Sequence, residues 1–376
     1  MTSSIGPTRE FRLINSDGHL SEPGDLWTSR VSTKMRDRAP RMQRFEEGDA
    51  WIIEGVKDPI NFGWNNVAGV PPEDIKAWVK FEDIRPGGYD PRARLDDMDR
   101  DRVDGDVLFP TPRTSQAIFA NPDEEYHLEM IRAYNDWLSE FTAYAPDRFC
   151  GAAMLPNRGG VKAAVAEIER VLDRPGIRTV VLGAWPNGSL SISPEDDEVW
   201  GALSDRGVPV TIHVALSLSM PGAHKAKLPG AGRYFDAPNR MIEMIFSGVF
   251  DRFPKLNVFF AEVDFGWVPY TREQIDNNYH RLDPSMRFNL SRPPRETIDR
   301  HFHFGYMSDA FGLDNLHHMN VERVLWSSDY PHVAADYPFS WRTIQATMSG
   351  IPNADRDLIL HKNAERLFGF GRTPSN

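Results

Sequence analysis

"INSDGHLSEP", residues 14–23, begins as an apolar segment and continues into a cluster of polar side chains. Asp17, His19 and Glu22 lie close together there, directly after residues typical of a short β-strand. A polar turn would explain such a cluster, because Asp, Gly and Ser are ordinary turn residues. A metal site would explain it equally well, so the rest of the chain has to decide between the two interpretations.

Seven further apolar segments follow, most of them rich in Val, Ile, Leu or Phe, as expected for strands of a buried parallel sheet. With the first segment they form the series FRLINSD, GDVLFPT, GAAMLP, TVVLGAW, VPVTIHVA, NVFFAEV, HFHFGYM and RVLWSSDYPH. Stretches with helical spacing lie between many of them, at 123–146, 160–173, 196–206, 236–252 and 354–370. Asp123 is the expected cap of the first stretch. Eight strands alternating with helices predict an α/β fold, a (β/α)8 TIM barrel.

The surplus length of the 376-residue chain is concentrated in one place. We expect a single domain, 1–376, with a long insertion at 24–100 between the first and second barrel strands. The insertion is rich in Trp, Pro and charge, and it would cover the barrel mouth either as a substrate wall or as a solvated excursion. A second long connection, 216–236, has the Gly and Pro content of a mobile lid or of a passive loop.

Composition excludes several classes of protein. The net charge is −11 and no basic block stands out, so we expect neither a nucleic-acid nor a membrane partner. The N-terminal segment lacks the apolar run of a signal peptide. Cys150 is the only cysteine, which excludes internal disulfides and fits a cytoplasmic location. The expected partner is a small-molecule substrate, and a homo-oligomer, with a dimer as the commonest form, is the expected assembly.

Polar side chains recur where the predicted strands end. Active sites of TIM barrels gather at the carboxyl ends of the strands. The first strand ends with Asp17 and His19, the fifth with His213, the sixth with Glu262 and the eighth with Asp329, followed by His332. Alternate residues of a strand share a face, so Asp17 and His19 point the same way, with Asn15 below them. Buried polar groups need partners, and one divalent cation could serve several of them at once.

Other histidines lack this placement. His301 and His303 form a local H-x-H pair and are rival ligands, but they lie near the start of their predicted strand, at the opposite end of the barrel. His317 and His318 are adjacent on a predicted helix and are expected at the surface.

The ordered set of motifs resembles the amidohydrolase superfamily. The motifs are SDGHLSEP, RVDGDVLFPT, GAAMLP, VTIHVA, FFAEVDFGWVPY, VLWSSDYPH and HKNAERLFGF. More narrowly, the chain is similar to the amidohydrolase-2 branch of metal-dependent TIM-barrel hydrolases and non-oxidative decarboxylases that includes aminocarboxymuconate semialdehyde decarboxylase. The resemblance implies a divalent metal bound by Asp17, His19, His213 and Asp329.

Two positions depart from that pattern. Many members have H-x-H on the first strand, where this chain has Asp17-Gly18-His19. Decarboxylating members tend to carry a catalytic histidine after the sixth strand, where this chain has Glu262. Two imidazoles and two carboxylates suit Zn, Fe(II) or Mn(II). One metal is expected; a site with two metals is the alternative, in which Glu22 and Glu262 would be the further oxygen donors.

The function expected from these residues is hydrolysis of an amide, ester or thioester by a metal-activated water. Glu262 would transfer the proton, with His332 as alternate base and Asp329 orienting the water. Glutamate in place of the histidine favours this over the alternative, non-oxidative decarboxylation of an aromatic or unsaturated acid. A non-catalytic, metal-stabilised binding module is a third hypothesis.

Three side chains are candidates for substrate binding. Arg113 follows the second strand and could pair with a substrate carboxylate in a bidentate manner. Trp185 and Trp267, with Phe109, are aromatic residues that could line an apolar pocket or belong to the ordinary core.

Overall fold

Eight parallel strands form the centre of the molecule. We describe residues 11–214 and 236–371 of a computed structural model, and every structural statement concerns these residues. The strands follow the order β1-β5-β6-β7-β8-β9-β10-β11, and an isolated bridge between Gly18 and Tyr330 joins the last to the first. Their bounds are β1 Ile14–His19, β5 Gly105–Phe109, β6 Phe149–Leu155, β7 Ile177–Leu182, β8 Val210–His213, β9 Val258–Ala261, β10 Phe302–Tyr306 and β11 Val324–Trp326. The predicted TIM barrel and all eight predicted strands are confirmed.

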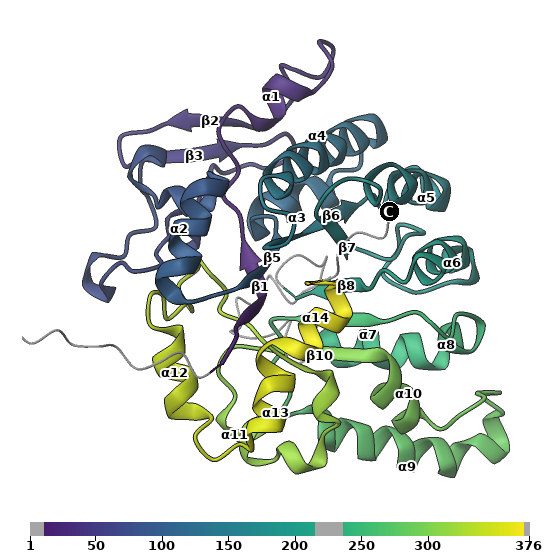
Figure 1. Ribbon diagram of the computed structural model, residues 1–376. Coiled ribbons are helices and arrows are strands. Elements are labelled where there is room, and N and C mark those ends of the chain that lie inside the picture. The colour runs from purple at the N-terminus through teal and green to yellow at the C-terminus, as the bar shows by residue number, and fades with distance from the viewer. Residues whose placement is uncertain (1–10, 215–235, 372–376) are drawn as a thin grey trace, which may run out of the picture.

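Helices surround this barrel (Figure 1). Their bounds are α1 Leu26–Arg30, α2 Pro91–Asp101, α3 Pro112–Ala120, α4 Glu124–Ala143, α5 Gly160–Val171, α6 Asp197–Arg206, α7 Ala237–Phe246, α8 Val249–Arg252, α9 Val268–Met286, α10 Pro294–His301, α11 Ala310–Asp314, α12 Ser340–Thr347, α13 Asn353–Asp357 and α14 Asn363–Phe368. The predicted cap of α4 is confirmed, because the Asp123 side chain accepts a hydrogen bond from the backbone N–H of Tyr126.

The register of the strands shows which side chains face the barrel interior. Thr211, Phe259 and His303 are neighbours across β8, β9 and β10, so they share one face, and His213 and Ala261 share it one step further along. Phe259 packs against Phe368 of α14, 5.3 Å between ring centroids. Since Phe259 lies early in its strand, the C-terminal helix closes the amino-terminal end of the barrel and leaves the other end for a site.

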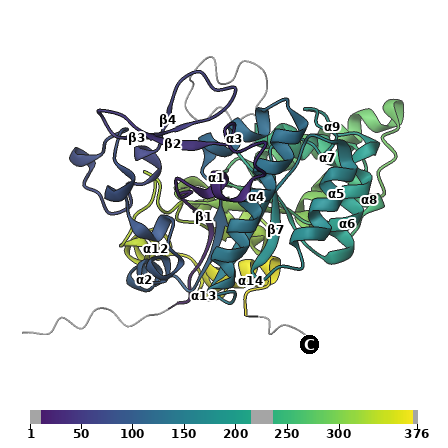
Figure 2. The same ribbon diagram turned by 90° about the horizontal axis from the view of Figure 1, so that it is seen from above.

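The segment between β1 and β5 carries a small antiparallel sheet of β2 (Arg41–Arg44), β3 (Asp49–Ile52) and β4 (Ile60–Asn61). Figure 2 shows this sheet on the side of the barrel opposite α13 and α14. The backbone N–H groups of Val67 and Ala68 in the same segment donate to the carbonyl of Pro331, beyond β11. Residues of the first and last strand connections therefore meet at the carboxyl end of the barrel.

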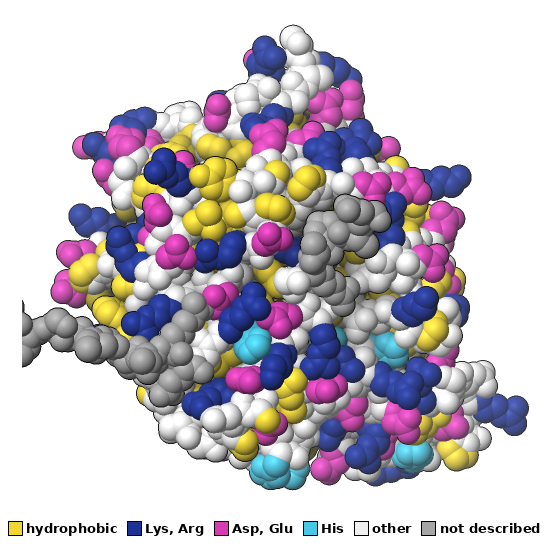
Figure 3. Space-filling view, viewed as in Figure 1, with side chains coloured by type: hydrophobic (Ala, Val, Ile, Leu, Met, Phe, Trp, Pro, Cys, Tyr) yellow, Lys and Arg dark blue, Asp and Glu magenta, His cyan; other side chains and the backbone are white. Residues whose placement is uncertain are grey.

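The surface carries mixed charge. On the face shown in Figure 3, basic and acidic side chains alternate, and neither sign forms one continuous patch. Among the described residues, every helix is too short or too polar to cross a bilayer. The predicted lid, 216–236, lies outside the described residues except for its last position.

Asp101, the last residue of α2, gives the fold a pH-dependent stability. Its carboxylate accepts hydrogen bonds from the backbone and the hydroxyl of Ser340, 3.0 and 2.6 Å. Burial raises the pKa of Asp101 to about 6, whereas an unfolded chain has its ordinary value of 3.8. The folded state therefore binds the extra proton between these values, and the stability associated with Asp101 falls as pH rises from about 4 to about 6.

Asp101→Asn is expected to remove this dependence, because the amide resembles the protonated acid. The free energy of unfolding of the variant, taken relative to the parent, should rise by about 2 kcal/mol between pH 4 and pH 7. Urea unfolding of both proteins at the two pH values measures the difference. Parallel pH profiles would contradict the assignment.

Candidate metal centre

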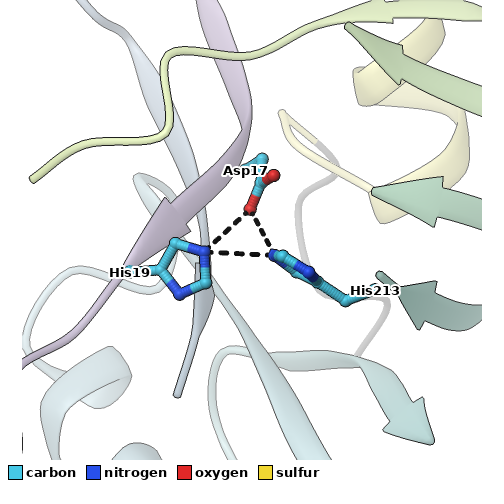
Figure 4. A group of neighbouring side chains, drawn as sticks. All are labelled: Asp17, His19 and His213. Atoms are coloured by element: carbon cyan, nitrogen blue, oxygen red, sulfur yellow. Dashed lines mark hydrogen bonds and ion pairs between the residues drawn. The ribbon is translucent and has the colours of Figure 1, made fainter. Parts of the chain in front are cut away.

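Three predicted ligands from two strands meet at the carboxyl end of the barrel (Figure 4). His213 Nε2 lies 3.1 Å from Asp17 Oδ1 and 3.1 Å from His19 Nε2. His19 Nε2 lies 3.4 Å from the same oxygen of Asp17. All three side chains are fully buried. Two imidazole nitrogens and a carboxylate oxygen thus converge on one point, which is the arrangement that a cation satisfies.

Asp329 and His332 complete the cluster from the segment after β11. Asp329 Oδ1 lies 3.5 Å from His19 Nε2 and 2.8 Å from His332 Nδ1. The His332 ring stacks on the His19 ring, with centroids 4.0 Å apart. Asp329 lies beyond the end of the strand and has φ 57°, so this left-handed conformation, rather than strand alternation, directs its side chain. The structure therefore brings the four expected ligands together, with His332 beside them.

The far ring nitrogens of the two histidines are also oriented. His19 Nδ1 lies 2.9 Å from the carbonyl oxygen of Pro110, so that nitrogen carries the proton and Nε2 offers its lone pair to the centre. His213 Nδ1 lies 3.8 Å from Glu262 Oε2. Asp17 Oδ2 is buried with no hydrogen-bond partner among the described residues. This donor set fits a divalent metal such as Zn, Fe or Mn.

The surroundings of the centre keep Asp17 ionised and His332 neutral. Burial acts to raise the pKa of Asp17, but His213 and His19 outweigh it and hold the pKa well below its usual range. Burial lowers the pKa of His332 to about 3, so its ring is neutral. Asp17 therefore remains an anion in a fully buried position, where a cation compensates it best.

The two further oxygen donors differ in position. Glu22 is buried, and its Oε1 accepts a hydrogen bond from the backbone N–H of Thr111, 2.9 Å away. Thr111 immediately precedes α3, so Glu22 anchors the start of that helix, and it is not part of the ligand clusters formed by the described residues. Glu262 follows β9 with φ 60° and lies on the far side of the His213 ring from Asp17, which makes it a neighbour of a ligand.

The predicted substrate-binding side chains make other contacts. Arg113 Nη1 donates to the backbone and side-chain oxygens of Asn61, which ties α3 to β4. Trp185 is fully buried, and its Nε1 donates to Glu243 Oε2, 3.3 Å away.

Trp267 belongs to the outer layer of the barrel. Its ring packs edge-on against Phe304, 5.8 Å between centroids. Phe304 points away from the face that its strand neighbour His303 shares with Phe259, so Trp267 lies between the sheet and the helices.

Phe109, at the end of β5, is the aromatic side chain that does contact the centre. Its ring centroid lies 5.1 Å from that of His213 and 6.0 Å from that of His19. The rival histidines lie elsewhere. His301 Nδ1 contacts the carbonyl oxygen of Leu256 before β9, and His303 lies at the start of β10, so both occupy the amino-terminal end of the barrel as expected.

Sequence reasoning missed a buried pair beneath the centre. Arg94 of α2 and Asp106 of β5 form an ion pair of 2.7 Å, and Asp106 also accepts from Asn15. Asp106 stands at an alternate position in a predicted strand, which was an available signal. Arg94 lies on a helix of the segment between β1 and β5 and gave no such signal.

Comparison with known proteins agrees with the geometry. The family model described as Amidohydrolase matches residues 25–370. The chain belongs to this amidohydrolase family. The match begins after Asp17 and His19, so the role of this pair rests on the geometry above.

Known proteins match most of the length of the chain. The γ-resorcylate decarboxylase of Rhizobium sp. (strain MTP-10005) is 27% identical over 331 residues, 80% of this chain and 92% of that protein. An amidohydrolase from Mycobacterium avium subsp. paratuberculosis K-10 has a similar structure, with a TM-score of 0.77 at 23% identity over 96% of this chain and all of that one. A dihydroxybenzoic acid decarboxylase of Polaromonas sp. JS666, crystallised with manganese, gives a TM-score of 0.68 at 20% identity over 96% and 98% of the two chains.

Gly18 separates the two ligands of β1 and leaves room for the groups beneath. A Cβ atom built there would lie 2.3 Å from Asp106 Oδ1 and 2.6 Å from Arg94 Nη2. We expect Gly18→Ala to lower the free energy of unfolding by about 1–3 kcal/mol through overpacking. Gly350→Ala is the control, because that position has no atom within 4 Å of an added Cβ. Similar urea midpoints for the two variants would contradict this prediction, because the side chains beneath Gly18 would then have moved aside without loss of stability.

The ligand assignment predicts metal content directly. The purified protein should bind about one divalent ion per chain. His213→Ala should lose most of it, because the imidazole that contacts both Asp17 and His19 is removed. His317→Ala is the matched control, since His317 is exposed. Elemental analysis after dialysis against a weak chelator gives the result, and equal metal content in both variants would refute the assignment.

Proposed function

We propose that the protein is a metal-dependent, non-oxidative decarboxylase of an aromatic or unsaturated carboxylic acid. The observation that carries the proposal is the similarity to a curated decarboxylase over 80% of the chain. The site is compatible with it, because the Phe109 ring lies beside His19 and His213 and offers an apolar surface to a planar substrate.

Asp17, His19, His213 and Asp329 would hold the metal, and manganese is a suitable ion for this mixture of donors. When bound, a divalent ion acts as a Lewis acid that orients the substrate oxygens and stabilises their negative charge. Each ligand side chain is oriented by the polar atom that does not face the metal. His19, for example, is oriented by the contact of its Nδ1 with the carbonyl oxygen of Pro110.

The reaction itself requires one proton. The bond between the substrate carbon and its carboxylate breaks, the electron pair remains on that carbon, carbon dioxide leaves, and a C–H bond forms. In this proposal Asp329 and His332 handle the proton, because His332 Nδ1 lies 2.8 Å from Asp329 Oδ1. Nε2 of His332 has no hydrogen-bond partner among the described residues and could exchange protons with solvent or substrate.

Hydrolysis, the reaction first expected from the residues, is supported less well, since the similarity extends to decarboxylases. It remains a second candidate because of one specific observation. Glu262 is a carboxylate 3.8 Å from His213 Nδ1, with 22% of its side chain exposed, and a partly exposed carboxylate beside a ligand could accept a proton from water.

Isotopes distinguish the two reactions. Purified protein with Mn²⁺ would be incubated with a panel of hydroxybenzoates, beginning with γ-resorcylate, and separately with aryl esters and amides. Decarboxylation in D2O places one deuterium on the carbon that carried the carboxylate and releases carbon dioxide. Hydrolysis in 18O-labelled water places one labelled oxygen in the acid product. Labelled acid with no release of carbon dioxide across the panel would overturn the proposal in favour of the second candidate.

Two variants separate the proposed proton donors. His332→Gln should reduce decarboxylation by about 10²–10⁴-fold, the usual contribution of a positioned acid–base group, and should keep the metal. Glu262→Gln should retain turnover within about tenfold, because Glu262 takes no part in the proton transfer proposed. If steady-state kinetics show the reverse order, Glu262 is the acid–base group.

A further inference from the structure

The barrel closes between β1 and β11, the seam with the least strand pairing, and three of the four proposed ligands lie there. Between β1 and β11, the His19 N–H donates to the Tyr330 carbonyl, 2.6 Å, and the Asp329 N–H donates to the Asp17 carbonyl, 2.9 Å. The isolated bridge between Gly18 and Tyr330 is the only β-pairing of this seam among the described residues. Small shifts of one strand against the other would therefore move Asp329 relative to the other ligands.

Arg94 of α2 supports the β1 side of this seam. Its side chain is fully buried, and Nη1 donates to the His19 carbonyl, 2.9 Å away. Nε donates to Asp106 Oδ2, 2.9 Å, and the guanidinium lies 4.2 Å from the centroid of the Tyr330 ring. One planar cation thus contacts a ligand residue of β1, a carboxylate of β5 and an aromatic ring of the β11 segment.

Asp97, one turn further along α2, supports the β11 side. It accepts hydrogen bonds from the hydroxyl groups of Tyr330 and Tyr337, each 2.6 Å away. Residues three apart on a helix lie on the same face, so Arg94 and Asp97 together face the seam. We call this pair the α2 clamp.

Asn15 transmits the position of Asp106 to both sides of the seam. Its Nδ2 donates to Asp106 Oδ1, 2.9 Å away. Its Oδ1 accepts from the backbone N–H groups of Asp17, 3.2 Å, and Ser328, 2.7 Å. The side chain of Asn15 therefore fixes the backbone of Asp17 and that of Ser328, which precedes Asp329. Asn15 is in turn held by Asp106, which pairs with Arg94.

We propose that Arg94 and Asp97 are positioning residues, by which α2 sets the spacing of the metal ligands across the β1–β11 seam. The inference rests on the proposed metal site, but it does not depend on which reaction the site performs. Groups that orient ligands without touching the metal typically contribute 10–100-fold to metal affinity. A buried ion pair with a purely structural role would alter stability alone.

The test measures Mn²⁺ affinity and stability in the same variants. Arg94→Lys keeps the charge opposite Asp106 but loses the planar fork that also reaches the His19 carbonyl. Asp97→Asn keeps the shape but cannot accept from both tyrosines. Each should raise the Kd for Mn²⁺, measured from the EPR signal of free Mn²⁺, by 10–100-fold. Asp101→Asn, buried on the same helix but bonded to Ser340, and Arg92→Lys, exposed on it, should change the Kd less than threefold.

A second measurement uses the unaltered protein, so it holds even if a variant does not fold. Binding at the centre should slow hydrogen exchange at the amides of α2, because the clamp links that helix to the ligands. Helix α5, which packs against α4, α6 and β6, serves as the internal reference. The expected result is that addition of Mn²⁺ slows exchange more in α2 than in α5.

The outcomes are separable. Unchanged Kd values in Arg94→Lys and Asp97→Asn, with only their urea midpoints lowered, would overturn the positioning role, as would an equal effect of Mn²⁺ on exchange in α2 and α5. Failure of the unaltered protein to bind Mn²⁺ would instead overturn the metal site. Binding of Mn²⁺ without release of carbon dioxide would overturn the decarboxylase proposal and leave the clamp as measured.

Discussion

The closure of the barrel between β1 and β11 is the constraint on which the site depends. Elsewhere in the barrel, neighbouring strands pair over two or more successive residues, but here two backbone hydrogen bonds, the side chain of Asn15 and the hydroxyl of Ser16, which donates to the Trp326 carbonyl, join them. The backbone groups of Asp17, His19 and Asp329 make the two backbone hydrogen bonds, and their side chains are proposed metal ligands. The contacts that close the barrel therefore also set the spacing of these ligands, and α2 contacts both strands.

Burial explains why this arrangement needs so many partners. Asp17, Arg94 and Asp106 are charged groups removed from water, and each would be costly if it stood alone. Asp106 is satisfied by Arg94 and Asn15, whereas Asp17 faces two imidazoles and retains one oxygen without a partner among the described residues. The pair beneath compensates its own charge, whereas the carboxylate of Asp17 has no Lys or Arg paired with it among the described residues. The metal proposed above would supply that charge.

Much of this could be predicted from the sequence. The eight strands follow from their apolar pattern, and the cap at Asp123 follows from its place before a helical pattern. The meeting of Asp17, His19 and His213 follows from the rule that barrel sites lie at the carboxyl ends of strands, whereas the direction of Asp329 depends on its left-handed backbone beyond β11. The α2 clamp could not be predicted, because α2 lies in the long connection between β1 and β5. The spacing of apolar residues does not show which strand such a helix packs against. Trp267 shows the converse: its position after β9 suggested the site, but its ring packs against Phe304 on the outer face, and only the register decides this.

The type of reaction is the hardest property to obtain from the ligands alone, since hydrolysis and decarboxylation use the same donors. The difference lies in where a proton is held relative to the substrate. A hydrolase needs a base beside a metal-bound water, and Glu262 lies behind His213, against its far nitrogen. A decarboxylase needs an acid beside the substrate carbon, and Asp329 with His332 forms a pair next to His19 and on the ligand side. In the proposed decarboxylase, Glu262 would therefore orient His213 and Asp329 with His332 would transfer the proton.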